Sequence, residues 1–152
     1  MVLGSATLDQ VSLVQLHGLS PTLRSLRLRL TNIPLSEVFN LICSFPLLED
    51  LGLFTYGAVS DIDDWDPPST SPKLIGSLEI GGGVLPVARR LCDLPGGLRF
   101  SKITLSCGKE DFTSTMDLVS RCSDTLESFT IYSYGSFTLA SLIGHHLTHC
   151  WL

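Results

Sequence analysis

One spaced pattern of apolar positions recurs five times along the chain: an apolar residue, two variable residues, a second apolar residue, one variable residue and a third. The copies occupy residues 23–28, 48–53, 75–80, 100–105 and 126–131. Their last positions follow one another in steps of 25, 27, 25 and 26 residues. A period this regular predicts a repeat architecture rather than a chance cluster of leucines.

Each copy is predicted to form one short strand. Side chains alternate between the two faces of a strand, so the second and third apolar residues of a copy point the same way. We expect neighbouring copies to pair in parallel, about 4.8 Å apart, and to bury these side chains in one shared core. The residues expected to stand side by side are Leu28, Leu53, Ile80, Leu105 and Ile131.

Helical patterns fill most of the segments between the copies. Residues 34–45, 84–95 and 114–122 each place apolar side chains on one helical face, and Ser114 is the predicted N-cap of the third. A last helix is predicted over 137–152. Residues 55–73 are acidic and rich in Pro and Ser, which favours a loop in place of that repeat's helix.

The period lies within the 20 to 29 residues of leucine-rich repeats. The predicted fold is therefore α/β, a leucine-rich-repeat solenoid of about five irregular repeats with strands on the concave side and helices and loops on the convex side. It forms a single domain over 1–152. A weaker copy of the pattern at 11–16 is interpreted as an irregular leading strand within a cap of about residues 1–20.

Composition excludes several classes of protein. Of the 152 residues, 44% are hydrophobic and 16% charged, which is typical of a packed domain. The net charge is −5, whereas a nucleic-acid binder normally carries a stripe of basic residues, so this class is disfavoured. No apolar run approaches the roughly 20 residues of a membrane span, and the start does not resemble a signal peptide. The odd number of cysteines indicates reduced thiols in the cytoplasm or nucleus.

Three segments of the sequence resemble those of a known family: "LSPTLRSLRL", "LSEVFNLICSFPLLEDLGL" and "LVSRCSDTLESFTI". Strand, helix, and a cysteine shortly before the next strand resemble the leucine-rich repeats of F-box proteins, and more narrowly those of mushroom-forming fungi. The resemblance covers roughly residues 11–135. It implies a non-enzymatic module that recognises the protein substrates of a ubiquitin ligase.

Two departures from that family change the expectation. Cys43 and Cys122 precede the next copy by one or two residues more than the common pattern. Only some twenty residues precede the first strong copy, whereas an F-box occupies about 40 to 50. We therefore do not expect this chain to bind a Skp-type adaptor, and it is a fragment, a truncated gene product or a paralogue without that module.

Candidate metal and phosphate motifs are all incomplete. His145, His149 and Cys150 could share a helical face, but no fourth zinc ligand stands nearby. The acidic stretch 61–66 lacks the Gly and Glu that a calcium loop needs at its sixth and twelfth positions. The Gly-rich stretch 81–86 lacks the Lys of a phosphate loop and is interpreted as a tight turn. No cofactor or metal is predicted.

Some residues allow two interpretations. Cys43, Cys92 and Cys122 are predicted to be core residues, since no histidine pairs with them recognisably, and Cys107 is left unassigned. A cysteine- or metal-dependent hydrolase is the alternative function, and it would show a deep pocket with converging titratable groups. A remnant without activity is a further alternative. Trp65 either anchors a partner or, as we favour, folds back over the repeats.

Strand alternation also names the surface that could bind a protein. Residues between the buried positions point away from the core, and most are small and polar. Arg and aromatic side chains among them are typical of interface hot spots, although charged side chains on a strand can simply be solvated. The candidate partner-binding residues on the concave face are Arg27, Arg29, Phe54, Glu79, Lys102 and Tyr132.

Overall fold

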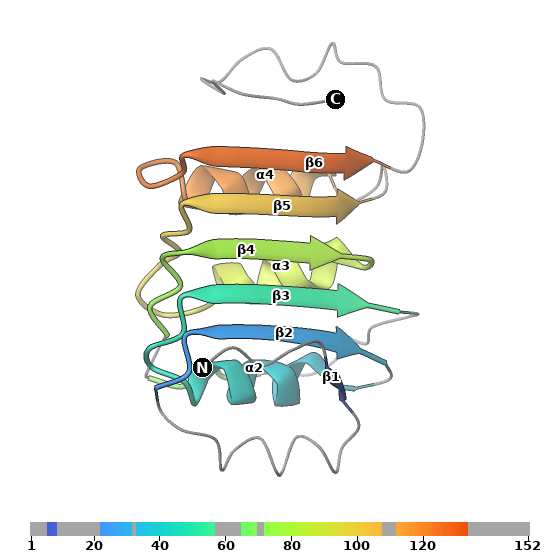
Figure 1. Ribbon diagram of the computed structural model, residues 1–152, viewed down its shortest axis with the longest axis vertical. Coiled ribbons are helices and arrows are strands. Elements are labelled where there is room, and N and C mark those ends of the chain that lie inside the picture. The colour runs from blue at the N-terminus through green and yellow to red at the C-terminus, as the bar shows by residue number, and fades with distance from the viewer. Residues whose placement is uncertain are drawn as a thin grey trace.

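The computed structural model describes residues 6–8, 22–31, 33–56, 65–69, 72–107 and 112–133. Figure 1 shows one parallel sheet with helices on its far side. The strands are β1 (Ala6–Leu8), β2 (Ser25–Leu30), β3 (Asp50–Thr55), β4 (Ser77–Gly81), β5 (Lys102–Cys107) and β6 (Ser128–Ser133). The helices are α2 (Leu35–Cys43), α3 (Val84–Cys92) and α4 (Phe112–Arg121).

The six strands lie in chain order, β1-β2-β3-β4-β5-β6, and every neighbouring pair is parallel. This confirms the α/β class and the parallel sheet. The register also confirms the predicted row, because the third apolar residue of each copy faces its equivalent on the next strand. That row reads Leu28, Leu53, Ile80, Leu105 and Ile131.

The core lies between the sheet and the helices. Strand residues such as Leu28 and Leu53 are at most 1% exposed, and they meet the apolar faces of α2, α3 and α4. Phe39 on α2 and Leu91 on α3 are fully buried. Each such side chain contributes about 1.5–3 kcal/mol by leaving water, which is how stacked repeats stabilise strands that are too short to fold alone.

A ladder of backbone hydrogen bonds sets where each strand begins. The carbonyl of Arg24 accepts the N–H groups of Glu49 and Asp50, at 2.8 and 2.9 Å. The carbonyl of Gly76 accepts those of Ser101 and Lys102 in the same way, and the carbonyl of Ser101 accepts two from Glu127 and Ser128. One doubly bonded carbonyl per step holds successive copies in register.

The 27-residue step between β3 and β4 breaks this ladder at one point. The Glu49 carbonyl accepts only the N–H of Gly76 (3.1 Å), and the N–H of Ser77 turns instead to the Asp50 carboxylate (2.7 Å). The Ser77 hydroxyl also donates to that carboxylate, at 2.7 Å. A Cβ on Gly76 would lie 2.4 Å from the same carboxylate oxygen, so only glycine leaves room for this bond.

The same step also changes the first apolar position of this copy. Ile75 is 45% exposed, and Leu74 is buried in its place at 1% exposure. Leu74 has φ 41°, a left-handed conformation that is uncommon for a branched residue. Its N–H bonds the Leu48 carbonyl at 2.8 Å. The extra residue of the long step is accommodated here, before β4 begins.

Several predicted boundaries shift. The helix predicted over 34–45 spans 35–43, and that over 84–95 ends at Cys92, before Pro95. The third helix begins at Phe112, so Ser114 lies inside it and the N-cap prediction is wrong. Thr55 belongs to β3 rather than to the loop. The strand beside β2 is 6–8; the predicted copy at 11–16 and helix over 137–152 lie outside the described residues.

Trp65 packs against both α2 and α3, as the fold-back interpretation predicts. Its ring lies 5.6 Å from that of Phe39 on α2, tilted by 58°. The Arg90 guanidinium on α3 stands 5.5 Å from the same ring. The indole N–H donates to the Asn40 side-chain oxygen at 2.9 Å. One half-buried side chain thus connects two helices that the loop leaves apart.

Replacing Trp65 by Ala should lower the free energy of unfolding by about 2 kcal/mol, because ring packing, the cation–π contact and the hydrogen bond are lost from a half-buried site. Trp65→Phe should fall in between. The exposed Tyr56→Ala serves as the control and should change stability by less than about 0.5 kcal/mol. Urea unfolding followed by circular dichroism measures all three. Equal values for Trp65→Ala and Tyr56→Ala would contradict the bridging role.

The turn from β4 into α3 depends on glycine. Gly82 has φ 87°, and a Cβ there would lie 2.1 Å from the Thr55 carbonyl oxygen. The buried Thr55 hydroxyl accepts the Gly83 N–H and donates to the Gly81 carbonyl (3.3 Å). The tight-turn interpretation of the Gly-rich stretch is therefore confirmed.

Gly82→Ala and Gly97→Ala form a matched pair. Both positions have positive φ, but nothing lies within 4 Å of a Cβ at Gly97. Gly97→Ala should cost about 1 kcal/mol of backbone strain. Gly82→Ala adds a clash with backbone and should cost about 3 kcal/mol or more. Thermal and urea unfolding compare the two, and equal losses would show that the Thr55 contact does not restrict position 82.

Candidate functional site

One face of the sheet carries no described helix. Helices α2, α3 and α4 all lie behind the strands in Figure 1, so the side chains that alternate with the core point to the other side. We call this surface the open face. From β2 to β6 it comprises Ser25, Arg27, Arg29, Asp50, Gly52, Phe54, Ser77, Glu79, Gly81, Lys102, Thr104, Ser106, Ser128, Thr130 and Tyr132.

The strand register arranges the open face in three rows, and all six candidate residues lie in them. The row at the amino end of the strands contains Asp50, Ser77 and Lys102. The middle row reads Arg27, Gly52, Glu79, Thr104 and Thr130. The row at the carboxyl end reads Arg29, Phe54, Gly81, Ser106 and Tyr132.

Arg27 and Glu79 form an ion pair across a strand. The Arg27 Nη2 to Glu79 Oε2 distance is 3.0 Å, although β3 lies between β2 and β4. The guanidinium can reach because Gly52 separates them: a Cβ at Gly52 would be 2.8 Å from the Arg27 Cγ. Both side chains are well exposed, at 58% and 36%. Such a pair contributes about 1 kcal/mol at most, so it positions the two groups more than it stabilises the fold.

Phe54 leans over a second glycine. A Cβ at Gly81 would be 2.9 Å from the Phe54 Cδ1, so the ring covers the neighbouring strand. Tyr132, two strands beyond Gly81, is 58% exposed. Between them stands Ser106, a small side chain. In the carboxyl-end row the small side chain of Ser106 therefore lies between two aromatic rings, Phe54 on one side and Tyr132 on the other, and forms a low floor between them.

Charge on the open face differs in sign from that of the whole chain. It carries Arg27, Arg29 and Lys102 against two carboxylates, whereas the chain has a net charge of −5. Glu79 is paired with Arg27, and Asp50 is engaged by Ser77. Among the described residues no carboxylate pairs with Arg29 or Lys102, and both side chains are exposed. The uncompensated charge of this face is positive.

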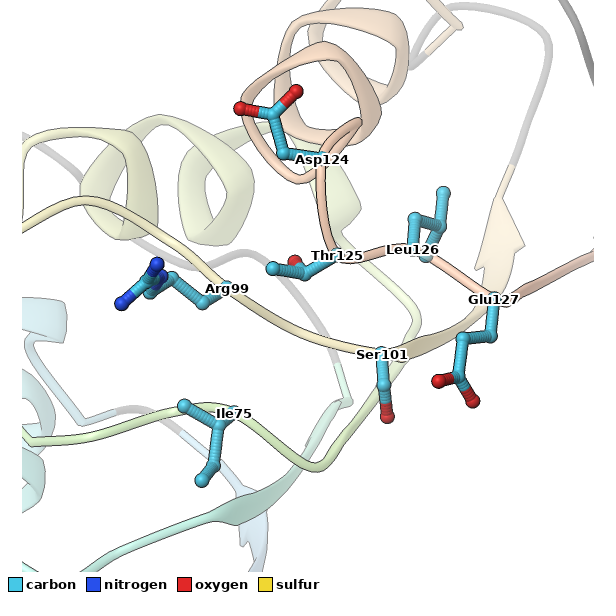
Figure 2. A pocket seen from close by; sticks show the side chains of 7 residues that line it. All are labelled: Ile75, Arg99, Ser101, Asp124, Thr125, Leu126 and Glu127. Atoms are coloured by element: carbon cyan, nitrogen blue, oxygen red, sulfur yellow. The ribbon is translucent and has the colours of Figure 1, made fainter.

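A groove of about 450 Å³ lies elsewhere, at the amino end of the sheet where the chain enters β4, β5 and β6. It is lined by Ile75, Arg99, Ser101, Asp124, Thr125, Leu126 and Glu127 (Figure 2). The charged side chains of Arg99, Asp124 and Glu127 point in different directions in this view. Groups that diverge in this way do not form the converging constellation that catalysis requires.

Cys43, Cys92 and Cys122 lack the features of nucleophiles. Cys43 and Cys122 are buried and Cys92 is half-buried, as predicted for core residues. Burial raises the pKa of the Cys43 thiol to about 11 and also raises the pKa values of Cys92 and Cys122. A reactive cysteine needs the opposite shift, since the thiolate is the attacking form.

Within the described ranges, no three side chains of His, Cys, Asp or Glu are grouped to hold a metal ion. His145, His149 and Cys150 lie outside those ranges, as do residues 61–64 of the acidic stretch. None of the helices that the structure describes has the length and apolarity to cross a bilayer. The compartment assignment stays a prediction.

Comparison with protein-family models, with curated proteins and with solved structures finds no significant match to this chain. The function is therefore inferred from the residues of the open face themselves.

Strand alternation predicts which residues lie on the open face, but it does not predict how their side chains interact. The glycines at 52 and 81 received no role, although each lies under a side chain from the preceding strand. Asp50 received no role either, yet its carboxylate accepts hydrogen bonds from Ser77. The available signal was the alignment of copies: Gly at the positions where the neighbouring copy has Arg27 or Phe54 marks space for a large side chain.

The raised pKa of Cys43 predicts a pH dependence of stability. The thiol contributes stability that is fully present below its usual pKa of 9.0 and is lost as the pH rises toward about 11. The stability difference between the native chain and Cys43→Ala should therefore shrink across that window. Urea unfolding at a series of pH values measures it, and a difference that does not vary with pH would contradict the shift.

Proposed function

We propose that the chain is a leucine-rich-repeat solenoid whose open face, the concave side of the coil, binds a protein partner. The support for the solenoid is the strand order, the steps of 25 to 27 residues and the doubly bonded carbonyls that recur between copies. Solenoids use extended sheet surfaces of this kind for protein recognition. The resemblance to F-box receptors points the same way.

The observation that carries the proposal is the carboxyl-end row of the open face. It combines the exposed guanidinium of Arg29, which has no carboxylate partner among the described residues, with the Phe54 ring, the small side chain of Ser106 and the exposed ring of Tyr132. Arginine and aromatic residues at well-spaced positions are the side chains from which binding hot spots are built. The small residues between them let a partner backbone approach the sheet.

The geometry favours binding over hydrolysis. A hydrolase would bring a nucleophile, a base and an oxyanion donor to one point. The described thiols lie in the core with raised pKa values, and the charged side chains of the groove diverge. The charged groups of the open face are spread along three rows, which suits an extended protein contact.

The proposed biological role is substrate recognition for a ubiquitin ligase in the cytoplasm or nucleus, by resemblance to F-box receptors. In that role the open face holds the substrate, and a separate helical module contacts the ligase.

Affinity capture from the native organism, with and without open-face substitutions, tests the proposal. A specific partner should be recovered by the unmodified chain and be reduced about tenfold or more by Tyr132→Ala, because truncating a hot-spot aromatic typically costs 2 kcal/mol or more. Arg27→Glu should act in the same direction, since it also sets two carboxylates side by side with Glu79.

Arg89→Glu provides the matched control. Arg89 is exposed on α3, on the opposite side of the sheet, and the substitution makes the same change in charge as Arg27→Glu. Circular dichroism melts of each variant show that the fold is retained. A partner lost with Tyr132→Ala and Arg27→Glu but kept with Arg89→Glu supports the open face. Equal recovery by all variants removes it as the binding surface.

A further inference from the structure

Resting on the proposed function, we propose that the partner segment held by the open face is acidic and extended, with an apolar side chain between its acidic groups. The acidic groups pair with Arg29 and Lys102, and the apolar side chain enters the space between Phe54 and Tyr132. Three features support this proposal in three steps: the unpaired charges of Arg29 and Lys102, the distance between them, and the shape of the carboxyl-end row between the two rings.

The first step is the balance of charges on the open face. Glu79 is paired with Arg27, whereas Asp50 keeps its charge while the backbone and hydroxyl of Ser77 donate to it, so three cations against two carboxylates leave a net charge of +1. Arg29 and Lys102 are exposed and have no carboxylate partner in the part of the chain that the structure describes. A partner that brings negative charge to these positions gains attraction, whereas a basic one meets two like charges.

The second step is the distance between the two cations. Arg29 lies on β2 in the carboxyl-end row and Lys102 on β5 in the amino-end row. Three strand spacings of about 4.8 Å and four residues of about 3.3 Å place them about 20 Å apart, diagonally across the sheet. A path that follows the carboxyl-end row from Arg29 to Ser106 and then β5 to Lys102 is about 28 Å long, which an extended chain covers in about eight residues. Two acidic positions about eight residues apart would therefore reach both cations.

The third step is the surface that such a segment crosses. A path along the carboxyl-end row and then along β5 passes the Phe54 ring, which leans over Gly81, and then the small side chains of Ser106 and Thr104, whereas the straight diagonal would cross the Arg27–Glu79 pair. Tyr132 stands on the far side of Ser106 at 58% exposure. A leucine-sized or aromatic side chain fits against two rings across this floor, where ring contacts contribute about 0.5–1.5 kcal/mol beyond buried area.

The same features argue against a nucleic-acid strand. A phosphate backbone carries a charge at every nucleotide and is bound by closely spaced cations. Here two free cations stand about 20 Å apart on a chain with a net charge of −5. Widely separated acidic side chains match this spacing better than a continuous row of phosphates.

Fluorescence anisotropy with the full chain tests the inference. The probe is a labelled peptide of about twelve residues in which Asp alternates with Leu and Tyr, so that more than one register places two Asp residues at the two cations. Its counterpart has Lys in place of every Asp. The Asp peptide should bind, more weakly as salt rises, and the Lys peptide should bind at least about tenfold more weakly.

Charge reversals locate the binding site. Arg29→Glu and Lys102→Glu should each weaken the Asp peptide about tenfold, and the double variant about a hundredfold because the sites are far enough apart to act independently. Arg89→Glu changes net charge equally on the helix side and should leave binding within about twofold. Equal weakening by Arg89→Glu would overturn the inference, since the effect would then come from net charge alone.

Three other results would also overturn it: equal binding of the Asp and Lys peptides, no binding of either, or tighter binding of a single-stranded oligonucleotide. The native partner separates this inference from the proposed function. If its capture is lost with Tyr132→Ala but persists with Arg29→Glu and Lys102→Glu, the open face binds the partner and the acidic-segment inference alone is wrong. If capture persists with all three variants, both are wrong.

Discussion

Parallel register between successive strands is the constraint on which the rest of the structure depends. A strand of five or six residues cannot bury its own apolar face, so each copy is stable only when its neighbours stand beside it. The doubly bonded carbonyls of Arg24, Gly76 and Ser101 fix where each strand starts. A slip of one residue would turn the buried side chains outward and the polar ones inward. Core and open face are therefore two consequences of one backbone arrangement.

The long step between β3 and β4 shows how that register survives an irregular repeat. One extra residue is absorbed before β4 by Leu74 in a left-handed conformation and by a carboxylate bond from Asp50 that only a glycine at 76 permits. Between β3 and β4, Trp65 contacts α2 and α3 together. Both devices keep β3 and β4 aligned where the periodic signal is weakest.

Much of this arrangement could be predicted from the sequence because period and alternation are properties of the chain itself. They located the strands β2 to β6, the row from Leu28 to Ile131 and the residues of the open face. Features that depend on contacts between strands could not be read in this way. The Arg27–Glu79 pair joins residues two strands apart, and Leu74 replaces Ile75 only because the backbone turns there. The start of α4 at Phe112 was missed because Ser114 mimics an N-cap.

Which open-face charges are available to a partner follows from where the glycines stand. Gly52 lets Arg27 reach Glu79, and Gly76 lets Asp50 reach Ser77, so two carboxylates are neutralised or engaged within the sheet. Had larger side chains stood at these positions, both carboxylates would face solvent beside Arg29 and Lys102, and the positive charge of the face would no longer be concentrated at these two residues. The small residues thus affect recognition indirectly: they decide which charged groups are bound within the chain and which remain free to bind another.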